Sequence, residues 1–581
     1  MIKPTPSHNS GLPKRHADFG TIAEALDYAA QGPTGLNFYS GKGVLVETLP
    51  YARLREDAVR LARRMLAAGL RPGDRVGLVA ESDGDFVRAF FACQYAGLVP
   101  APLPLPAAFG GKDGYVAHLR RMIERARAAA AFGPAMLEPW LEEAVSGLGL
   151  RISGTLAVLD GVPPREGDLP PQDPCGLGYV QFSSGSTRAP VGVAVTQRAF
   201  MANARGVCRD GLRGVDGDRG VSWLPLYHDM GLVGFLLTPV ACQMSIDIIP
   251  TREFARRPLV WLQLISRNRA TVSYSPSFGY ELCVSRAETV AVEGLDLTSW
   301  RSAGIGGDMI RPNVLTRFAQ RFAPYGFEPG AFVPSYGMAE ATLALSFTAP
   351  GQGARVDTVD GVVLENAHRA VPAGDGALRT RTFVRCGTIL PGHEAEIRDE
   401  AGRVLPDRRV GRIFARGPSL MAGYLEAPEE TAQVMTADGW LDTGDLGYLV
   451  EGEIVITGRA KDLIIVNGRN LWPQDLEWTV EAEVAALRSG DVAVFSIEGD
   501  EEEEVVALVQ CRTSDPAARD ALVAEIANVF RARHSLESRI VLVPPHSLPQ
   551  TSSGKLSRSR ARAMYLACAF RRPAAAEIGA E

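Results

Sequence analysis

Hydroxyl-bearing side chains gather on one short loop in this 581-residue chain. The loop follows an apolar run that ends at Phe182, and its candidate phosphate-binding residues are Ser183, Ser184, Gly185, Ser186 and Thr187. Hydroxyls can donate to phosphate oxygens, and a glycine lets the backbone approach closely, as a phosphate cradle requires. An ordinary Ser/Gly turn is the alternative interpretation, because clustered hydroxyls are common in loops.

A lone lysine, Lys555, stands on a second loop of small residues far downstream, after Ser552, Ser553 and Gly554. A charged side chain on such a loop is poor core material. Together the two loops indicate a nucleoside triphosphate held by hydroxyls and backbone N–H groups, with a mobile cation delivered to the developing charge. That is the chemistry of carboxylate adenylation.

An aromatic residue, a glycine and a carboxylate follow one another in segment 334–342. Tyr336, beside Gly337, can lie against a flat base. Glu340, about one helical turn further on, can reach a magnesium ion on the phosphates. A plain helix start is the alternative interpretation.

Two further positions are candidate partners for a ribose. Asp445 follows a glycine on a tight loop, where its carboxylate can accept hydrogen bonds from both ribose hydroxyls; a plain hairpin turn is the alternative. Arg459 is a second candidate, and it begins segment 459–462, where we place a domain boundary that also contains Lys461.

The composition, 46% hydrophobic and 22% charged, indicates a globular protein. A net charge of −6 gives no reason to expect nucleic-acid binding. The eight histidines lack metal-ligand spacing and the eight cysteines form no C-x-x-C pair, so we expect reduced thiols in a cytoplasmic protein. The N-terminus lacks a signal-peptide core, and since a membrane span needs about 20 apolar residues, we expect no integral membrane segment.

Helical and strand patterns alternate through the first two thirds of the chain. The spacing predicts a helix over 52–69, a strand over 75–80 and a helix from 83 or 84 to 95. This alternation predicts an α/β fold with a largely parallel sheet. After segment 459–462 we expect a unit of roughly 120 residues, within the usual domain range, and an alanine-rich, frayed tail after residue 572. Its expected elements are a helix over 474–486, strands over 491–497 and 505–511, and a helix over 518–533.

The phosphate loop, segment 334–342, the Asp445 loop, segment 459–462 and the Lys555 loop resemble, in this order along the chain, the motifs of adenylate-forming enzymes. That superfamily comprises acyl-CoA synthetases, adenylation domains of peptide synthetases and luciferase-like ligases. The resemblance runs from about residue 20 to about residue 570. It implies a large N-terminal core over residues 1–458, with two sheet-and-helix subdomains and a smaller barrel-like part. It also implies a hinge at 459–462 and a small mobile α+β domain over 463–581 that carries the catalytic lysine.

Within that superfamily the chain is most similar to fatty acyl-AMP ligases. Arg188 stands where CoA synthetases usually have glycine, and segment 227–232 reads Tyr-His-Asp-Met-Gly-Leu, as in that branch. The stretch after Glu340 is longer than most CoA ligases have. Its extra part, including residues 356–368, resembles an insertion whose implied effect is to disfavour CoA as acceptor.

Two positions depart from the superfamily pattern. Val191 replaces a lysine that many relatives carry after the phosphate loop, which leaves Lys555 as the main positive charge. Residues 306–309 read Gly-Gly-Asp-Met where the usual pattern around the adenine is a small residue, then Ala-Glu-Pro.

The resemblance implies that a fatty acid carboxylate attacks the α-phosphate of ATP, giving acyl-AMP and pyrophosphate. Lys555 would bridge the carboxylate and the α-phosphate, and Glu340 would hold Mg²⁺. The other implied roles are ribose binding by Asp445 and Arg459, adenine binding by Tyr336 and Gly337, an acyl tunnel bordered by His228, and a hinge at Lys461. Core packing and a tunnel wall explain Ser273, Ser275, Ser277 and Phe278 equally well.

The acyl group then needs an acceptor. The chain has no phosphopantetheine attachment motif of the Asp-Ser-Leu type, so an acyl carrier protein would act in trans. Three interpretations compete: a fatty acyl-AMP ligase that loads a carrier protein, a fatty acyl-CoA synthetase, and an inactive nucleotide-binding regulator. The presence of Lys555, Asp445 and Glu340 argues against the last.

Overall fold

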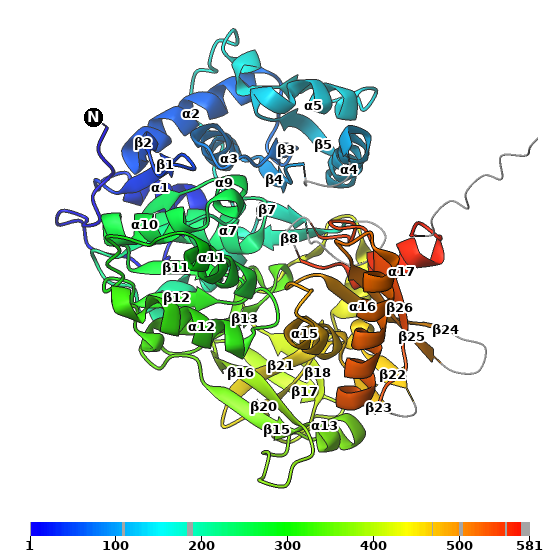
Figure 1. The fold of residues 1–581 in the computed structure, drawn as a ribbon. Coiled ribbons are helices and arrows are strands. Elements are labelled where there is room, and N and C mark those ends of the chain that lie inside the picture. The colour runs from blue at the N-terminus through cyan, green and yellow to red at the C-terminus, as the bar shows by residue number, and fades with distance from the viewer. Residues whose placement is uncertain are drawn as a thin grey trace, which may run out of the picture.

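The structure is a computed structural model that describes residues 2–106, 111–182, 190–466, 469–498, 503–551 and 555–570. The candidate phosphate-loop residues Ser183, Ser184, Gly185, Ser186 and Thr187 lie outside the described residues, as do Arg188 and the tail from residue 571. Figure 1 shows the chain from its blue N-terminal layers to the orange and red C-terminal elements on the right.

A small, fully parallel sheet in the order β4-β3-β5-β6 forms the upper layer in Figure 1. Helix α2 follows the predicted apolar spacing and buries Leu54, Ala58 and Met65. Helix α3 begins after Asp83, whose side chain accepts a hydrogen bond from the Phe86 N–H, so this cap fixes the start of the helix. The bounds are β3 (Arg75–Val79), β4 (Val99–Leu103), β5 (Ala128–Phe132), β6 (Ile152–Gly154), α2 (Tyr51–Ala67), α3 (Gly84–Ala96), α4 (Gly111–Ala126) and α5 (Glu138–Val145).

A second, long sheet occupies the centre of the molecule in the order β17-β18-β20-β21-β16-β14-β13-β12-β11-β9-β10-β1-β2, with β15 paired to β16. Strands β1, β10, β9, β11, β12 and β13 run parallel. From β13 onward the pairs are antiparallel, so the expectation of a largely parallel sheet holds only for the first half. The parallel-half bounds are β1 (Gly35–Tyr39), β9 (Arg219–Ser222), β10 (Ser245–Ile248), β11 (Val272–Ser275), β12 (Ser302–Ile305) and β13 (Phe332–Gly337).

The antiparallel half carries the candidate ribose residues and the expected insertion. Strand β15 and helix α13 make up the insertion, and α13 is capped by Asp360, which accepts from two backbone N–H groups. The bounds are β2 (Leu45–Pro50), β14 (Ala344–Phe347), β15 (Val356–Asp360), α13 (Gly361–Ala367), β16 (Thr380–Ile389), β17 (Glu394–Arg398), β18 (Gly411–Arg416), β20 (Leu441–Val450) and β21 (Glu453–Arg459).

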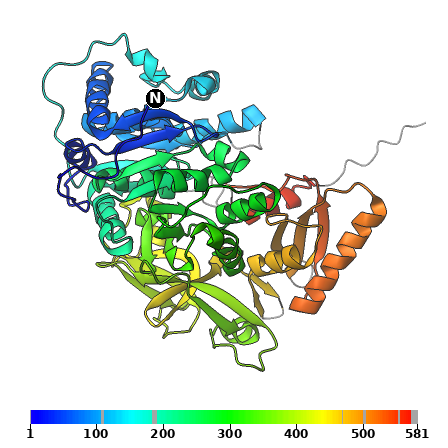
Figure 2. The same ribbon diagram turned by 60° about the vertical axis from the view of Figure 1, so that its left-hand side comes forward.

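The elements after η8 (Ala460–Asp462) have hydrophobic clusters of their own, one of them centred on Val480, Val494 and Ile526. Figure 2 shows these orange and red elements beside the central sheet. The predicted strands are present. The first predicted helix ends early, at Glu483, and the second runs as α16 to Val529 and continues in π-helical geometry to His534. The bounds are β22 (Ile464–Val466), β23 (Arg469–Leu471), α15 (Pro473–Glu483), β24 (Val492–Glu498), β25 (Glu503–Gln510), α16 (Pro516–Val529), β26 (Arg539–Val543) and α17 (Arg558–Leu566).

The expectation that all cysteines are free thiols is wrong for one pair. Cys208 and Cys242 form a disulfide across 34 residues of sequence. Cys208 lies in the π-helical segment Gly206–Gly211, and Cys242 directly follows helix α8 (Thr238–Ala241). The fold brings these two segments together, which no local motif shows. In the described ranges, each helix is too short or too polar to cross a membrane.

Candidate active site

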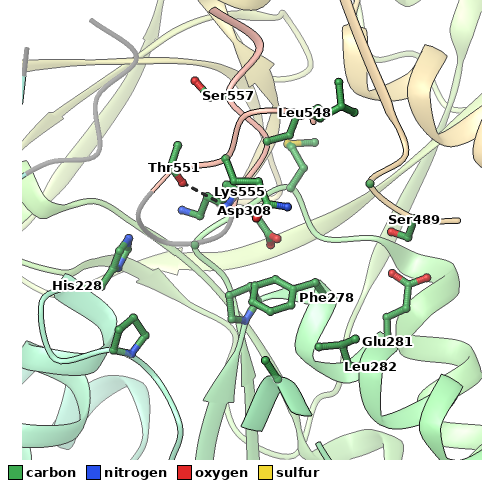
Figure 3. Close-up of a pocket in the computed structure, with 18 of the residues that line it drawn as sticks. His228, Phe278, Glu281, Leu282, Asp308, Ser489, Leu548, Thr551, Lys555 and Ser557 are labelled. Atoms are coloured by element: carbon green, nitrogen blue, oxygen red, sulfur yellow. Dashed lines mark hydrogen bonds between the residues drawn. The ribbon is translucent and has the colours of Figure 1, made fainter. Parts of the chain in front are cut away.

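A cavity of about 2090 Å³ lies between the central sheet and the C-terminal elements (Figure 3). It collects candidate residues that are hundreds of positions apart in the sequence. The predicted site residues that line it are His228, Tyr336, Gly337, Asp445, Arg459, Lys461 and Lys555.

Lys555 enters this main cavity from a loop that is closed by its own hydrogen bonds. The Thr551 N–H donates to the Lys555 carbonyl at 2.7 Å, and the Lys555 N–H donates to Thr551 Oγ1 at 3.2 Å. Burial lowers the pKa of the Lys555 ammonium, while the carboxylates of Asp308 and Asp229 partly offset the fall. These carboxylates therefore offset part of the cost of burying the lysine's positive charge.

Asp308 is a site residue that the sequence reasoning did not assign. Burial raises its pKa to about 6, and the nearby Lys555 charge opposes that rise. The Ser277 N–H lies 3.4 Å from Asp308 Oδ1, which orients the carboxyl group. Its segment, 306–309, departs from the superfamily pattern, but the sequence pattern assigns this aspartate no role.

The two candidate ribose residues face each other across neighbouring strands. Asp445 on β20 pairs in register with Arg459 on β21, and Arg459 Nε lies 3.4 Å from Asp445 Oδ1. The Tyr336 hydroxyl donates to Asp445 Oδ2 at 2.8 Å. Burial raises the pKa of Asp445, and the Arg459 charge counters part of that rise. The carboxylate keeps lone pairs free to accept further hydrogen bonds.

Glu340 lies beside the main cavity but is not among the residues that line it. It sits in the turn η7 (Ala339–Ala341), where the Tyr424 hydroxyl donates to Glu340 Oε1 at 2.9 Å. The Met421 N–H donates to the Glu340 carbonyl at 2.8 Å. Burial raises the pKa of this carboxyl group, and the Tyr424 hydrogen bond and the Arg459 charge oppose the rise. In the part of the chain that the structure describes, no three metal-ligand side chains cluster.

His228 borders the main cavity just before the short helix α7 (Asp229–Leu232). Its Nδ1 lies 2.5 Å from Asp229 Oδ1. Burial alone would raise the pKa of Asp229, but His228 and Lys555 hold it below its usual value. Asp229 therefore adds a second carboxylate near the lysine.

Lys461 lies in the turn η8, at the mouth of the main cavity. Burial and the neighbouring Arg459 charge lower the pKa of its ammonium group. Its neighbour Asp462 accepts a hydrogen bond from Arg558 Nη1 at 3.2 Å, which ties this turn to helix α17.

One wall of the main cavity is apolar and aromatic. Trp223 stacks on Phe254 with ring centroids 3.9 Å apart, and Phe278 meets Trp223 edge-on. The candidates Ser273, Ser275 and Ser277 do not line the cavity; Ser273 Oγ accepts from Trp261 Nε1 and donates to a backbone carbonyl, as core packing requires. Phe278 does line it. An apolar wall next to a cationic centre suits an acid with a hydrocarbon chain.

Comparison with known proteins agrees with this geometry. Residues 37–425 match the family described as AMP-binding enzyme, and residues 461–573 match the one described as Disco-interacting protein 2-like, AMP domain. A Caulobacter vibrioides protein named "Putative acyl-CoA synthetase" is 55% identical, with 98% of each chain covered. JamA of Moorena producens, a medium-chain-fatty-acid–[acyl-carrier-protein] ligase, is 32% identical, with 94% of this chain and 95% of JamA covered.

A solved structure from a study of fatty acyl-adenylate ligases of E. coli and L. pneumophila superposes with a TM-score of 0.92. It is 44% identical, and the match covers 96% of this chain and 100% of that one. The fold and the order of the motifs are thus those of adenylate-forming enzymes, as the sequence predicted. With a family match over most of its length and relatives above 30% identity along nearly the whole chain, this protein belongs to the AMP-binding enzyme family.

Proposed function

We propose that this enzyme activates a fatty acid with ATP and passes the acyl group to the phosphopantetheine thiol of an acyl carrier protein in trans. The observation that carries the proposal is the position of Lys555. Its C-terminal loop places the ammonium group in the same cavity as Asp445 and Arg459, beside an aromatic wall. The relatives named as fatty acid ligases support the same chemistry.

In the first step, a carboxylate oxygen of the fatty acid attacks the α-phosphorus of ATP. The new bond is an acyl–phosphate anhydride, and the bond to pyrophosphate breaks. Lys555 stabilises the negative charge that builds on the carboxylate and α-phosphate oxygens, so the protein acts by position and charge. Asp445 and Arg459 hold the ribose, and Tyr336 with Gly337 holds the adenine. The candidate phosphate loop would hold the phosphates, and it lies outside the described residues.

The single carboxylate expected near the phosphates suits Mg²⁺, and it does not suit a metal ion held by protein ligands alone. Mg²⁺ usually binds through one or two carboxylates together with substrate phosphates and water. Glu340 offers one carboxylate, and the Tyr424 hydrogen bond orients it. When bound, the ion would neutralise phosphate charge during the displacement.

The insertion supports the choice of a carrier protein over CoA, because it binds the C-terminal elements. Glu365 of α13 accepts from Arg379 Nη2 at 2.5 Å and from Arg469 Nη2 at 3.0 Å. Asn470 Nδ2 lies 2.7 Å from His368 Nε2 and also donates to the Glu365 carbonyl. These contacts join α13 to strand β23. We propose that they restrain the C-terminal domain, over residues 463–581, in the orientation that keeps Lys555 in the cavity.

Transfer to a thiol would need a different orientation, with rotation about the hinge at 459–462 relative to the core at 1–458. We propose Lys461 as the residue about which that change occurs.

A fatty acyl-CoA synthetase is the second candidate, and one observation favours it. The relative at 55% identity is named "Putative acyl-CoA synthetase". The inactive regulator loses support, because relatives across nearly the full chain are named as ligases.

The test uses the purified full chain with ATP, Mg²⁺ and saturated acids of several lengths. Pyrophosphate release and trapping of acyl-AMP with hydroxylamine report the first step. Mass spectrometry then follows acyl transfer, in parallel, to CoA and to a phosphopantetheinylated carrier protein. We expect acyl-AMP and acyl-carrier product with little acyl-CoA. Efficient acyl-CoA synthesis would replace this proposal by the second candidate, and no pyrophosphate release with any acid would overturn both.

A further inference from the structure

A second, smaller cavity, here called the inner pocket, adjoins the main cavity. Its volume is about 70 Å³. Five residues line both cavities: Met230, Gly307, Ser335, Tyr336 and Gly337. Lys555 Nζ lies 4.0 Å from the position that a Cβ on Gly307 would occupy. The inner pocket therefore begins next to the place where the reacting carboxylate is expected.

The walls of the inner pocket are mainly apolar. Phe235 and Phe347 pack around Tyr274, each with its ring centroid 6.2 Å from that of the tyrosine. If each water-sized group occupies about 15 Å³, the volume of the inner pocket holds on the order of five such groups. The inner pocket thus suits a short segment of an acyl chain, while the main cavity has room for the remainder.

Two hydroxyl groups in the inner pocket have no hydrogen-bond partner. They are Thr238 Oγ1 and the Tyr274 hydroxyl, in residues that are only 2% and 7% exposed. Ser335 is the polar neighbour of Tyr274 and opposes part of the rise in its pKa, but the two hydroxyls do not reach hydrogen-bond geometry, and Ser335 Oγ lies 3.5 Å from the Ile305 carbonyl oxygen. Burial raises the pKa of Tyr274, so its hydroxyl stays a neutral donor.

The charged residues that line the same pocket are, by contrast, all paired. Lys14 Nζ donates to the Val215 carbonyl at 2.7 Å, Asp218 accepts from Arg301, and Asp229 contacts His228. The two hydroxyls without a partner are therefore the polar groups of this pocket whose hydrogen bonding a ligand would complete. A saturated hydrocarbon segment would leave both unsatisfied, which is unfavourable in a buried site. A ligand oxygen would satisfy them.

We propose that the preferred substrate is a fatty acid with a hydroxyl or oxo group near its carboxyl end, and that this oxygen enters the inner pocket and hydrogen-bonds Tyr274 and Thr238. This inference rests on the proposed function and specifies the substrate class of the same site. Tyr274 and Thr238 act as specificity-determining residues and take no part in the chemical step. A site built around a substrate hydroxyl discriminates strongly against the analogue that lacks it.

The experiment compares kcat/KM for acyl-AMP formation between one saturated acid and its 2-hydroxy, 3-hydroxy, 5-hydroxy and 3-oxo derivatives. The saturated acid is the length that gives the most acyl-AMP in the assay above. We expect at least one oxygenated acid to be preferred by about tenfold or more, and the Tyr274→Phe and Thr238→Val variants to lose most of that preference while still using the saturated acid.

Matched controls exist elsewhere in the core. Tyr179 and Thr348 also have buried hydroxyls without partners, but they line neither cavity. Tyr179→Phe and Thr348→Val should leave the preference unchanged, and thermal melting verifies that all four variants fold. Equal kcat/KM for saturated and oxygenated acids overturns the inference while the proposed function stands. A preference that survives in Tyr274→Phe and Thr238→Val has the same consequence. Failure to form acyl-AMP with any of these acids overturns the proposed function itself.

Discussion

The contact between Arg381 and Asp475 gives the sharpest test of a restrained C-terminal domain. Arg381 lies on β16, next to the insertion, and its Nη2 donates to Asp475 Oδ1 of helix α15 at 2.7 Å. The guanidinium group also stacks between Phe383 and Trp472, at 4.5 Å and 4.3 Å from the ring centroids. Two of its three partners therefore belong to the C-terminal segment, and its side chain is only 11% exposed.

Removing one member of a largely buried ion pair costs about 3–5 kcal/mol, because the remaining charge is left without its partner. Asp475 is 22% exposed, so solvent compensates part of that cost and about 3 kcal/mol is a reasonable figure. This corresponds to roughly a hundredfold change in the equilibrium between the observed orientation and others. Arg381→Ala should therefore loosen the C-terminal domain and raise the ratio of acyl-CoA to acyl-AMP, by tenfold to about a hundredfold.

Two assays follow the change: acyl-CoA formation by mass spectrometry, and limited proteolysis near residues 459–462. Asp475→Asn removes the same ion pair from the other side and should give the same result. Arg408→Ala is the matched control, because Arg408 pairs with Asp357 inside the insertion and does not reach the C-terminal segment. Folded Arg381→Ala and Asp475→Asn proteins with unchanged proteolysis and unchanged acyl-CoA yield would refute the reasoning.

Three other predictions concern single side chains. Lys555→Ala should lower the rate of acyl-AMP formation by about 100-fold or more with an unchanged melting temperature, since it removes the main charge at the reacting centre; a near-normal rate would contradict the mechanism. Asp445→Ala should weaken ATP binding by about tenfold or more, with little effect on fatty acid binding, because each hydrogen bond to a charged acceptor contributes roughly 1.5–3 kcal/mol; calorimetry that finds equal ATP affinity would remove the ribose assignment. Burial and nearby arginines lower the pKa of His534 from 6.5 to about 4, so the fold favours the neutral ring. The stability that the neutral ring contributes is complete above pH 6.5 and is lost as pH falls toward 4, by about 3 kcal/mol in total at 1.36 kcal/mol per pH unit. In urea titrations, the free energy of unfolding of His534→Gln should therefore fall less over that pH range than that of the unmodified protein. The same pH dependence in both proteins would contradict this assignment.

Local patterns predicted the elements well where one physical signal dominates. The apolar spacing of residues 52–69 predicted helix α2, because that signal acts within a few residues. The helix expected from residue 83 or 84 is α3, and the structure adds that Asp83 caps it. The helix predicted over 518–533 is present, but its change from α-helical to π-helical geometry at Phe530 was not predicted, since no proline or glycine marks it.

The candidate site was predicted through motifs, and its internal contacts were not. Tyr336 was assigned to the adenine, and its hydroxyl bond to Asp445 spans 109 residues of sequence. Asp308 was missed because only the fold shows that it faces Lys555. Likewise, residues 356–368 could be recognised as an insertion by length, but the bond from Arg469 to Glu365 depends on how two distant segments pack.

The difference between the motifs, which were predicted, and their contacts, which were not, has a physical origin that also bears on how the enzyme works. A motif is a local arrangement of groups, and its chemistry can be inferred from residue types alone. The environment of Lys555 is instead assembled from three distant segments: the loop after β12 with Asp308, the helix α7 with Asp229, and strand β20 with Asp445. None of these carboxylates belongs to the C-terminal elements that carry the lysine, so their attraction for its charge favours the orientation suited to adenylation. When pyrophosphate leaves after adenylation, acyl-AMP with its α-phosphate stays bound and that attraction remains, so release of Lys555 for the transfer step must be driven by contacts elsewhere. The ion pairs between α13, β16 and the C-terminal elements oppose this release, which is why the acceptor preference should respond to Arg381 and Asp475 although neither lines the main cavity.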